Sequence, residues 1–104
     1  RKAMPKGYWV ASLDVKDEAD YAEYRKRNAK VFAQYGGRFL VRGGVPGASI
    51  GKKRSHIVVI EFSTYEAALA CFNSLEYQAA KAYLSRGTNI SLVVLPEYEG
   101  EQPG

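Results

Sequence analysis

The sequence has little cysteine and histidine, and this scarcity removes several classes of protein. Its 104 residues include one cysteine, Cys71, and one histidine, His56. One cysteine cannot form an intramolecular disulfide, and the two residues together are too few for a zinc site of the usual Cys/His kind. We therefore expect neither a disulfide framework nor a metal.

Long apolar runs are also missing. No run approaches the ~18 residues that a membrane-spanning helix needs, and the N-terminus has no charged segment followed by an apolar signal core. We therefore expect a cytoplasmic protein with no membrane partner.

Excess charge of one sign is small. The formal net charge is +4, and two of the positive charges are Arg1 and Lys2. Residues 1–3 precede Met4, and we expect them to be a remnant of expression, without which the net charge is +2. The basic cluster Lys52-Lys53-Arg54 has no interleaved aromatic platform. We therefore expect no nucleic-acid partner.

The loop at residues 43–54 is rich in glycine but lacks the features of a phosphate cradle. No helix is expected after it, and no Lys-Ser or Lys-Thr pair follows at the required spacing. We expect no cofactor. The loop is long, so we expect it to be mobile and to serve as a lid.

What the chain does contain is a regular succession of strand and helix signals. Aromatic and β-branched residues predict strands at 8–15, 38–42, 56–62 and 89–95. Asp17 caps an expected helix from Glu18 to Tyr35, which Gly36 ends. Ser63 and Glu66 match a capping box, which predicts a second helix from residue 64. A break at 73–74 is expected in it, with a further helical piece ending at 87.

This order is β-α-β-β-α-β, the α+β arrangement called ferredoxin-like. It predicts a four-stranded antiparallel sheet with two helices on one face. A chain of 104 residues supports one hydrophobic core. We expect a single domain over residues 4–99 and a loose C-terminal tail over 100–104.

The strands are apolar on both faces, although the helices can cover only one. The segments that carry this pattern are Tyr8-Trp9-Val10-Ala11, Ile57-Val58-Val59-Ile60 and Leu92-Val93-Val94-Leu95. A monomer would therefore expose a large apolar patch. Face-to-face packing of two sheets in a symmetric homodimer is the economical solution, and a monomer with a partly apolar second face is the alternative.

Several segments together resemble one family. They are Gly7-Tyr8-Trp9, Tyr21 to Tyr24 with Asn28, Tyr35-Gly36-Gly37-Arg38-Phe39, Val41-Arg42-Gly43-Gly44, Val59-Ile60-Glu61-Phe62, Tyr65-Glu66-Ala67-Ala68 and Ser74-Leu75-Glu76-Tyr77-Gln78. The chain resembles domain of unknown function 1330, within the dimeric α+β barrel superfamily. Leu75 departs from the resemblance, because related sequences often have proline there, and His56 is no hallmark of the family.

The resemblance implies a homodimer and a ligand cavity between the helices and the sheet of each subunit. Asn28 lies on an apolar helix face, where a buried amide must find a hydrogen-bond partner in the fold or in a ligand. Arg42 ends a strand beside two glycines and is suited to a ligand carboxylate. The plainer interpretation of Arg42 is an ion pair with Glu61.

The remaining candidates are a histidine and tyrosines. His56 is the only histidine, the residue type that most often serves as a general acid or base, although an ordinary role at a strand end is the plainer interpretation. Tyr24 and Tyr77 are expected to present phenol groups to the cavity, or to be core residues with hydroxyls at its rim. The candidate pocket thus comprises Tyr24, Asn28, Arg42, His56, Glu61 and Tyr77. No catalytic residue is assigned.

Two functions follow from these residues and the resemblance. The first is a protein that binds a small, partly apolar metabolite between helices and sheet and acts on it as a cofactor-independent oxygenase or isomerase. The second is a non-catalytic dimeric binding or stress-associated module. The sequence contains no nucleophile–base pair that decides between an enzyme and a binding protein.

Overall fold

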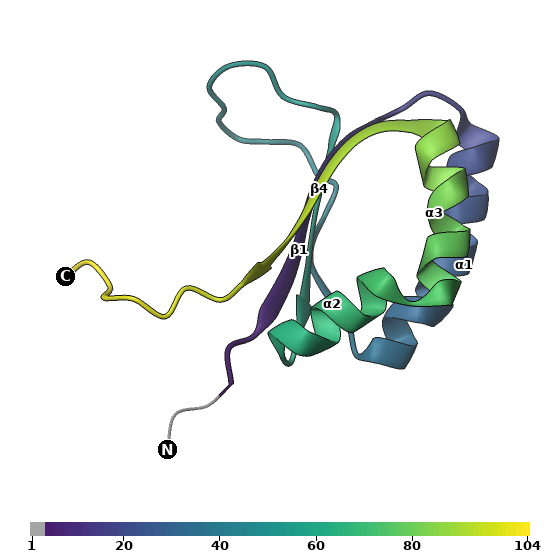
Figure 1. The fold of residues 1–104 in the computed structure, drawn as a ribbon. Helices are drawn as coiled ribbons and strands as arrows, with labels where there is room; N and C mark the ends of the chain where they lie inside the picture. The colour runs from purple at the N-terminus through teal and green to yellow at the C-terminus, as the bar shows by residue number, and fades with distance from the viewer. Residues whose placement is uncertain (1–3) are drawn as a thin grey trace.

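The computed structural model describes residues 4–104, and the expected expression remnant at 1–3 lies outside them. A sheet forms one layer and the helices form the second, all on the same side of the sheet (Figure 1). The elements in chain order are β1 Gly7–Val15, α1 Glu18–Tyr35, β2 Arg38–Arg42, β3 His56–Phe62, α2 Tyr65–Asn73, α3 Leu75–Gly87 and β4 Thr88–Pro96. The predicted ferredoxin-like fold is confirmed, with the second helix in two pieces.

The sheet is antiparallel, with strand order β2-β3-β1-β4. Side chains alternate between the two faces of a strand, so Trp9, Ala11 and Leu13 of β1 face the helices and are buried. The neighbouring strands follow the same register: Trp9 is opposite Ile60 on β3 and Val94 on β4. This helix-facing side of the sheet forms one wall of the core.

Helix α1 has the bounds that the sequence predicts, because both of its ends carry specific signals. The Asp17 carboxylate accepts a hydrogen bond of 3.1 Å from the Asp20 amide. At the other end Gly36 adopts a left-handed conformation with φ 76°, which glycine tolerates without steric cost. The buried residues of α1 are Tyr24, Asn28, Val31 and Phe32.

The second helical region breaks where the sequence predicts it. The Ser74 hydroxyl accepts from the Tyr77 amide at 3.1 Å and donates to the Cys71 carbonyl at 2.7 Å, so it caps α3 and closes α2. The start of α2 differs from the expectation by one residue. Thr64, not Ser63, is the cap, because its hydroxyl accepts from the Ala67 amide at 3.0 Å.

A β-bulge interrupts β2 and changes which residues face the helices. Phe39 is opposite Ile60, but Val41 is already opposite Val59 and Arg42 opposite Val58, so Leu40 is the extra residue. Ile60 and Val58 both face the helices, and Phe39 and Arg42 therefore do so too. Without the extra residue, simple alternation would put Phe39 and Arg42, which are three positions apart, on opposite faces of the sheet.

No helix of the described residues 4–104 lies on the other face of the sheet (Figure 1). This face exposes large apolar side chains from all four strands: Val10, Val41, Ile57, Val93 and Leu95, each 36% exposed or more. The loop between β2 and β3 and the C-terminal tail both project on this side. We call this surface the open face.

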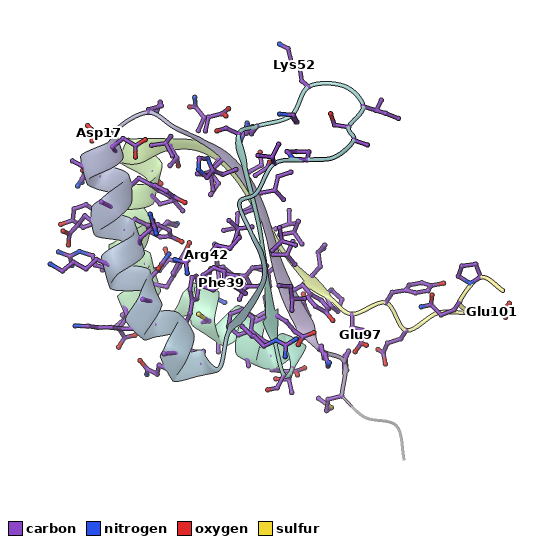
Figure 2. The ribbon with its side chains drawn as sticks, turned by 180° about the vertical axis from the view of Figure 1, so that it is seen from behind. Asp17, Phe39, Arg42, Lys52, Glu97 and Glu101 are labelled. Carbon is purple, nitrogen blue, oxygen red and sulfur yellow. The ribbon has the colours of Figure 1, made fainter. Side chains whose placement is uncertain are left out.

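The loop does not lie where the expected lid would. Lys52 near its tip is far from α1 (Figure 2), and none of its residues lines the cavity described below.

No helix among residues 4–104 combines the length and the hydropathy that crossing a membrane requires.

Candidate functional site

A cavity of about 50 Å³ lies between the sheet and helices α1 and α3. A water molecule needs roughly 10–15 Å³ on the same scale, so there is room for several waters or for part of a small ligand. Its walls are mainly apolar and aromatic. The lining residues are Trp9, Ala11, Leu13, Tyr21, Tyr24, Arg25, Asn28, Phe32, Phe39, Arg42, Val58, Ile60, Leu84, Ile90 and Leu92.

The space exists because a small side chain occupies the middle of the sheet. Ala11 lies on central strand β1 between Val58 and Leu92 of the neighbouring strands, and all three line the cavity. Further along β1, the Trp9 indole fills the interface, contacts Phe32 at 5.1 Å between ring centroids, and donates from Nε1 to the Ala68 carbonyl at 2.9 Å. The Trp9 and Phe32 rings therefore form one end wall of the cavity, and the open space lies beside Ala11.

Three polar groups meet at the buried end of the cavity. The hydroxyls of Tyr24 and Tyr77 are 2.9 Å apart, one on α1 and one on α3, and the Asn28 amide is close enough to the Tyr24 hydroxyl to lower its pKa. Burial has the larger, opposite effect and raises the pKa of Tyr24; it likewise raises that of Tyr77. Both phenols therefore stay protonated at neutral pH and act as hydrogen-bond donors and acceptors.

Two arginines stand at the exposed end. Arg42 faces α1 from β2 (Figure 2), and its guanidinium carbon lies 4.2 Å from the centroid of the Phe39 ring. Arg25 on α1 lies 5.9 Å from the Tyr21 ring centroid. Both positive charges lower the pKa of the Tyr21 phenol, against a larger increase from burial. Within residues 4–104 neither arginine has an ion pair or a hydrogen bond with a side chain.

Glu61 is not part of this site, contrary to the sequence prediction. Its neighbours Ile60 and Phe62 are buried against the helices, so alternation turns Glu61 to the open face. There it accepts a hydrogen bond from the Tyr8 hydroxyl at 3.2 Å and pairs with Lys6 at 3.6 Å and Arg38 at 4.0 Å. The ion pair expected between Glu61 and Arg42 does not form, because the two side chains lie on opposite faces.

His56 lies near the cavity without lining it. Its ring centroid is 6.2 Å from that of Tyr21, and its Nδ1 is 3.2 Å from the Ser55 hydroxyl. The same hydroxyl is 3.0 Å from Asp14 Oδ1, which also accepts from the Ser55 amide at 2.8 Å. Those hydrogen bonds lower the pKa of Asp14. Ser55 thus links the side chains of His56 and Asp14 and connects the start of β3 to β1.

Of the predicted pocket residues, the structure thus brings together Tyr24, Asn28 and Arg42 in the lining, with Tyr77 behind Tyr24. The sequence interpretation missed Arg25 as a second cation of the site and Ala11 as the residue that leaves the space. A usable signal for Ala11 was the alternation Trp9, Ala11, Leu13, which places a small residue on the core face of β1.

No cluster of three or more His, Cys, Asp or Glu side chains suited to a metal ion occurs within residues 4–104. Cys71 is buried in the core, and burial raises the pKa of its thiol to about 12. It behaves as the small hydrophobic residue that the sequence predicts.

The comparisons with known proteins agree with this architecture. The profile of the family described as Domain of unknown function (DUF1330) matches residues 6–98. The chain belongs to this family. A comparison with curated proteins gives no match.

Solved structures share the fold of this DUF1330 protein at low sequence identity. A protein of unknown function from Rhodopseudomonas palustris has a TM-score of 0.75 and 15% identity, covering 94% of this chain and 86% of that one. SnoaB, a cofactor-independent oxygenase from Streptomyces nogalater, has a TM-score of 0.64 and 14% identity, covering 95% and 96%. A dimeric ferredoxin-like protein of unknown function from Thermobifida fusca has a TM-score of 0.60 and 14% identity, covering 92% and 94%.

Proposed function

We propose that this DUF1330 protein binds a small, partly apolar metabolite in the cavity between its helices and its sheet. The observation that carries the proposal is the convergence of Tyr24, Asn28 and Arg42 on one space with aromatic and aliphatic walls. Ligand pockets typically combine such walls with a few polar groups that fix orientation.

The proposal includes a homodimer formed through the open face. Five large apolar side chains are exposed there, from all four strands. Burying them against a second copy removes apolar surface from water at roughly 25 cal/mol per Å². The description of the Thermobifida fusca neighbour as dimeric supports this arrangement.

A cofactor-independent oxygenase or isomerase is the second candidate, and the fold shared with SnoaB favours it. A non-catalytic dimeric binding or stress-associated module is the alternative. The described cavity lining contains no carboxylate or imidazole, and its buried tyrosine Tyr24 is held protonated. Its own side chains therefore supply hydrogen bonds and positive charge more readily than a base, which makes binding the function that the geometry supports best.

Thermal-shift screening against a metabolite library tests the binding proposal, since a ligand that binds only the folded state raises the melting temperature. The matched control is Ala11→Leu, which places a larger apolar side chain in the cavity. We expect hits on the unaltered protein that disappear in this variant. Hits that persist in Ala11→Leu would place binding elsewhere, and a library without hits would contradict the proposal.

Turnover then separates an enzyme from a binding module. Each hit is incubated with the protein in air, and oxygen uptake and product formation are followed by an oxygen electrode and mass spectrometry. Oxygen consumed in proportion to product supports the oxygenase, and product of unchanged mass supports an isomerase. A ligand recovered unchanged supports the non-catalytic module.

A further inference from the structure

We propose that the ligand of this cavity is an aromatic monocarboxylate, whose carboxylate meets Arg42 and Arg25 at the exposed end while its ring lies against the apolar walls. This inference rests on the proposed function, because it names the chemical class of the metabolite bound in the same cavity.

The first step of the argument is where Arg42 points. The bulge at Leu40 turns this arginine to the helix side of the sheet, which is otherwise the apolar side, with Val58 opposite it on β3. Regular alternation would have placed it on the same face as Arg38 and Glu61. Bulges often occur next to functional sites, where they redirect a side chain.

The second step is that both arginines lack an acidic partner. The carboxylates that pair with other arginines are engaged: Glu23 with Arg27 at 2.7 Å, and Asp20 with Arg86 at 3.7 Å. Within residues 4–104 no carboxylate pairs with Arg25 or Arg42. Each guanidinium instead lies near an aromatic ring that also lines the cavity, Tyr21 for Arg25 and Phe39 for Arg42. Two cations beside one opening attract an anion, and a guanidinium binds a carboxylate in a bidentate manner.

The third step is the shape and chemistry of the interior. Trp9, Phe32 and Phe39 surround the space with aromatic rings, which favour edge-on or offset contacts with another ring. The volume of about 50 Å³ takes in part of a ring, and the rest of the ring with its charged substituent remains at the opening. The Tyr24 hydroxyl and the Asn28 amide in the lining provide hydrogen bonds for a polar group on the part of the ligand that enters.

The test compares matched pairs of ligands by isothermal titration calorimetry at neutral pH and low ionic strength. The probes are phenylacetate, 4-hydroxyphenylacetate, cinnamate and indole-3-acetate, each beside its neutral primary amide. We expect at least one carboxylate to bind roughly tenfold or more tightly than its amide, because hydrogen bonds to a charged group are stronger than those to a neutral one. Raising the ionic strength should weaken the carboxylate and leave the amide unchanged.

Three substitutions locate the effect. Arg42→Gln and Arg25→Gln should each remove most of the preference for carboxylate over amide. Arg42→Lys should retain part of that preference, since lysine keeps the positive charge but lacks the planar guanidinium group that binds a carboxylate in a bidentate manner. Arg38→Gln is the matched control: this arginine lies on the same strand but faces Glu61 on the open side, so the preference should persist. Circular dichroism melts establish that each variant is folded.

The outcomes distinguish this inference from the proposed function. If neutral amides bind, lose binding in Ala11→Leu, and no carboxylate binds more tightly than its amide, the inference is overturned and the cavity remains a binding site. A carboxylate preference unchanged by Arg42→Gln and Arg25→Gln overturns it as well. If neither ligand class binds and the metabolite library also gives no hit, both proposals fail.

Discussion

The hydroxyls of Tyr24 and Tyr77 depend unequally on each other inside the core. The Tyr24 hydroxyl has two polar neighbours, the Tyr77 hydroxyl and the Asn28 amide. If Tyr77 loses its hydroxyl, Tyr24 therefore keeps Asn28, whereas the Tyr77 hydroxyl loses its hydrogen-bond partner if Tyr24 loses its own. A buried hydroxyl that loses its partner costs about 1–3 kcal/mol. Tyr24→Phe should therefore lower the free energy of unfolding by an amount in that range, and Tyr77→Phe should lower it by less.

Urea denaturation of both single variants and the double variant checks this prediction. The double variant removes both hydroxyls, so we expect it to lose less stability than the sum of the two single changes. Strict additivity would show that the two hydroxyls do not interact in solution.

The buried acids also predict a dependence of stability on alkaline pH. Burial raises the pKa of Cys71 to about 12 from 9.0, and raises the pKa values of Tyr24 and Tyr77 above 10.0. Above pH 9 the unfolded chain releases protons that the folded chain retains, so stability falls as pH rises. Below pH 9 the contribution of these groups is fully present.

Urea denaturation at a series of pH values between 7 and 11 measures this slope. In Cys71→Ala the part of the decline that begins near pH 9 should be smaller, while the part due to the tyrosines remains. An unfolding free energy that stays constant up to pH 11 in the unaltered protein would contradict the prediction.

At the scale of the elements, the junction between α2 and α3 suits a proline at position 75. Leu75 is the first residue of α3 and is 86% exposed. Ser74 before it has φ −67° and ψ 149°, the extended conformation that a residue before proline prefers. Proline is favoured at the first position of a helix, where its missing amide hydrogen is not needed.

Leu75→Pro should therefore raise the free energy of unfolding by about 0.4–1 kcal/mol, because it restricts the unfolded chain at little cost to the folded one. Thermal and urea denaturation measure the change. Leu75→Ala is the control that removes the same exposed side chain without fixing φ, and proline should be the more stabilising of the two. A loss of stability in Leu75→Pro would show that the amide or the backbone angle at this position matters.

The elements also show why the sequence predicted part of the site. Helix α1 could be placed from Asp17 and Gly36, and its periodicity put Tyr24 and Asn28 on the buried face. Strand β2 was placed equally well, but the side that Arg42 faces depends on one extra residue at Leu40. Nothing local marks that bulge, because it is set by pairing with β3. The interpretation of Arg42 as a partner of Glu61 therefore failed, although the strand bounds were right.

At the scale of the whole molecule, the open face predicts that charge introduced there will disrupt the proposed homodimer. Val93 on β4 is 49% exposed and lies opposite Val10 of β1. In a symmetric dimer the Val93→Asp substitution would bury one aspartate from each subunit without an oppositely charged partner, which costs several kcal/mol of dimerisation free energy. We expect dimerisation to weaken on the order of a hundredfold or more.

Light scattering after size-exclusion chromatography, over a range of protein concentrations, measures the change. Leu75→Asp is the control, since it places the same charge on an exposed apolar position of a helix instead of the open face. It should leave the oligomeric state unchanged. A monomeric mass for the unaltered protein at all concentrations would refute the dimer.

The position of the single tryptophan gives the protein a built-in optical reporter. Trp9 is 1% exposed, packs 4.8 Å from the Tyr77 ring between centroids, and borders the cavity. Its emission should be blue-shifted in the native state, move to longer wavelength when the chain unfolds, and change in intensity when an aromatic guest enters beside it. Folding and occupancy can thus be followed in one cuvette without attaching a dye.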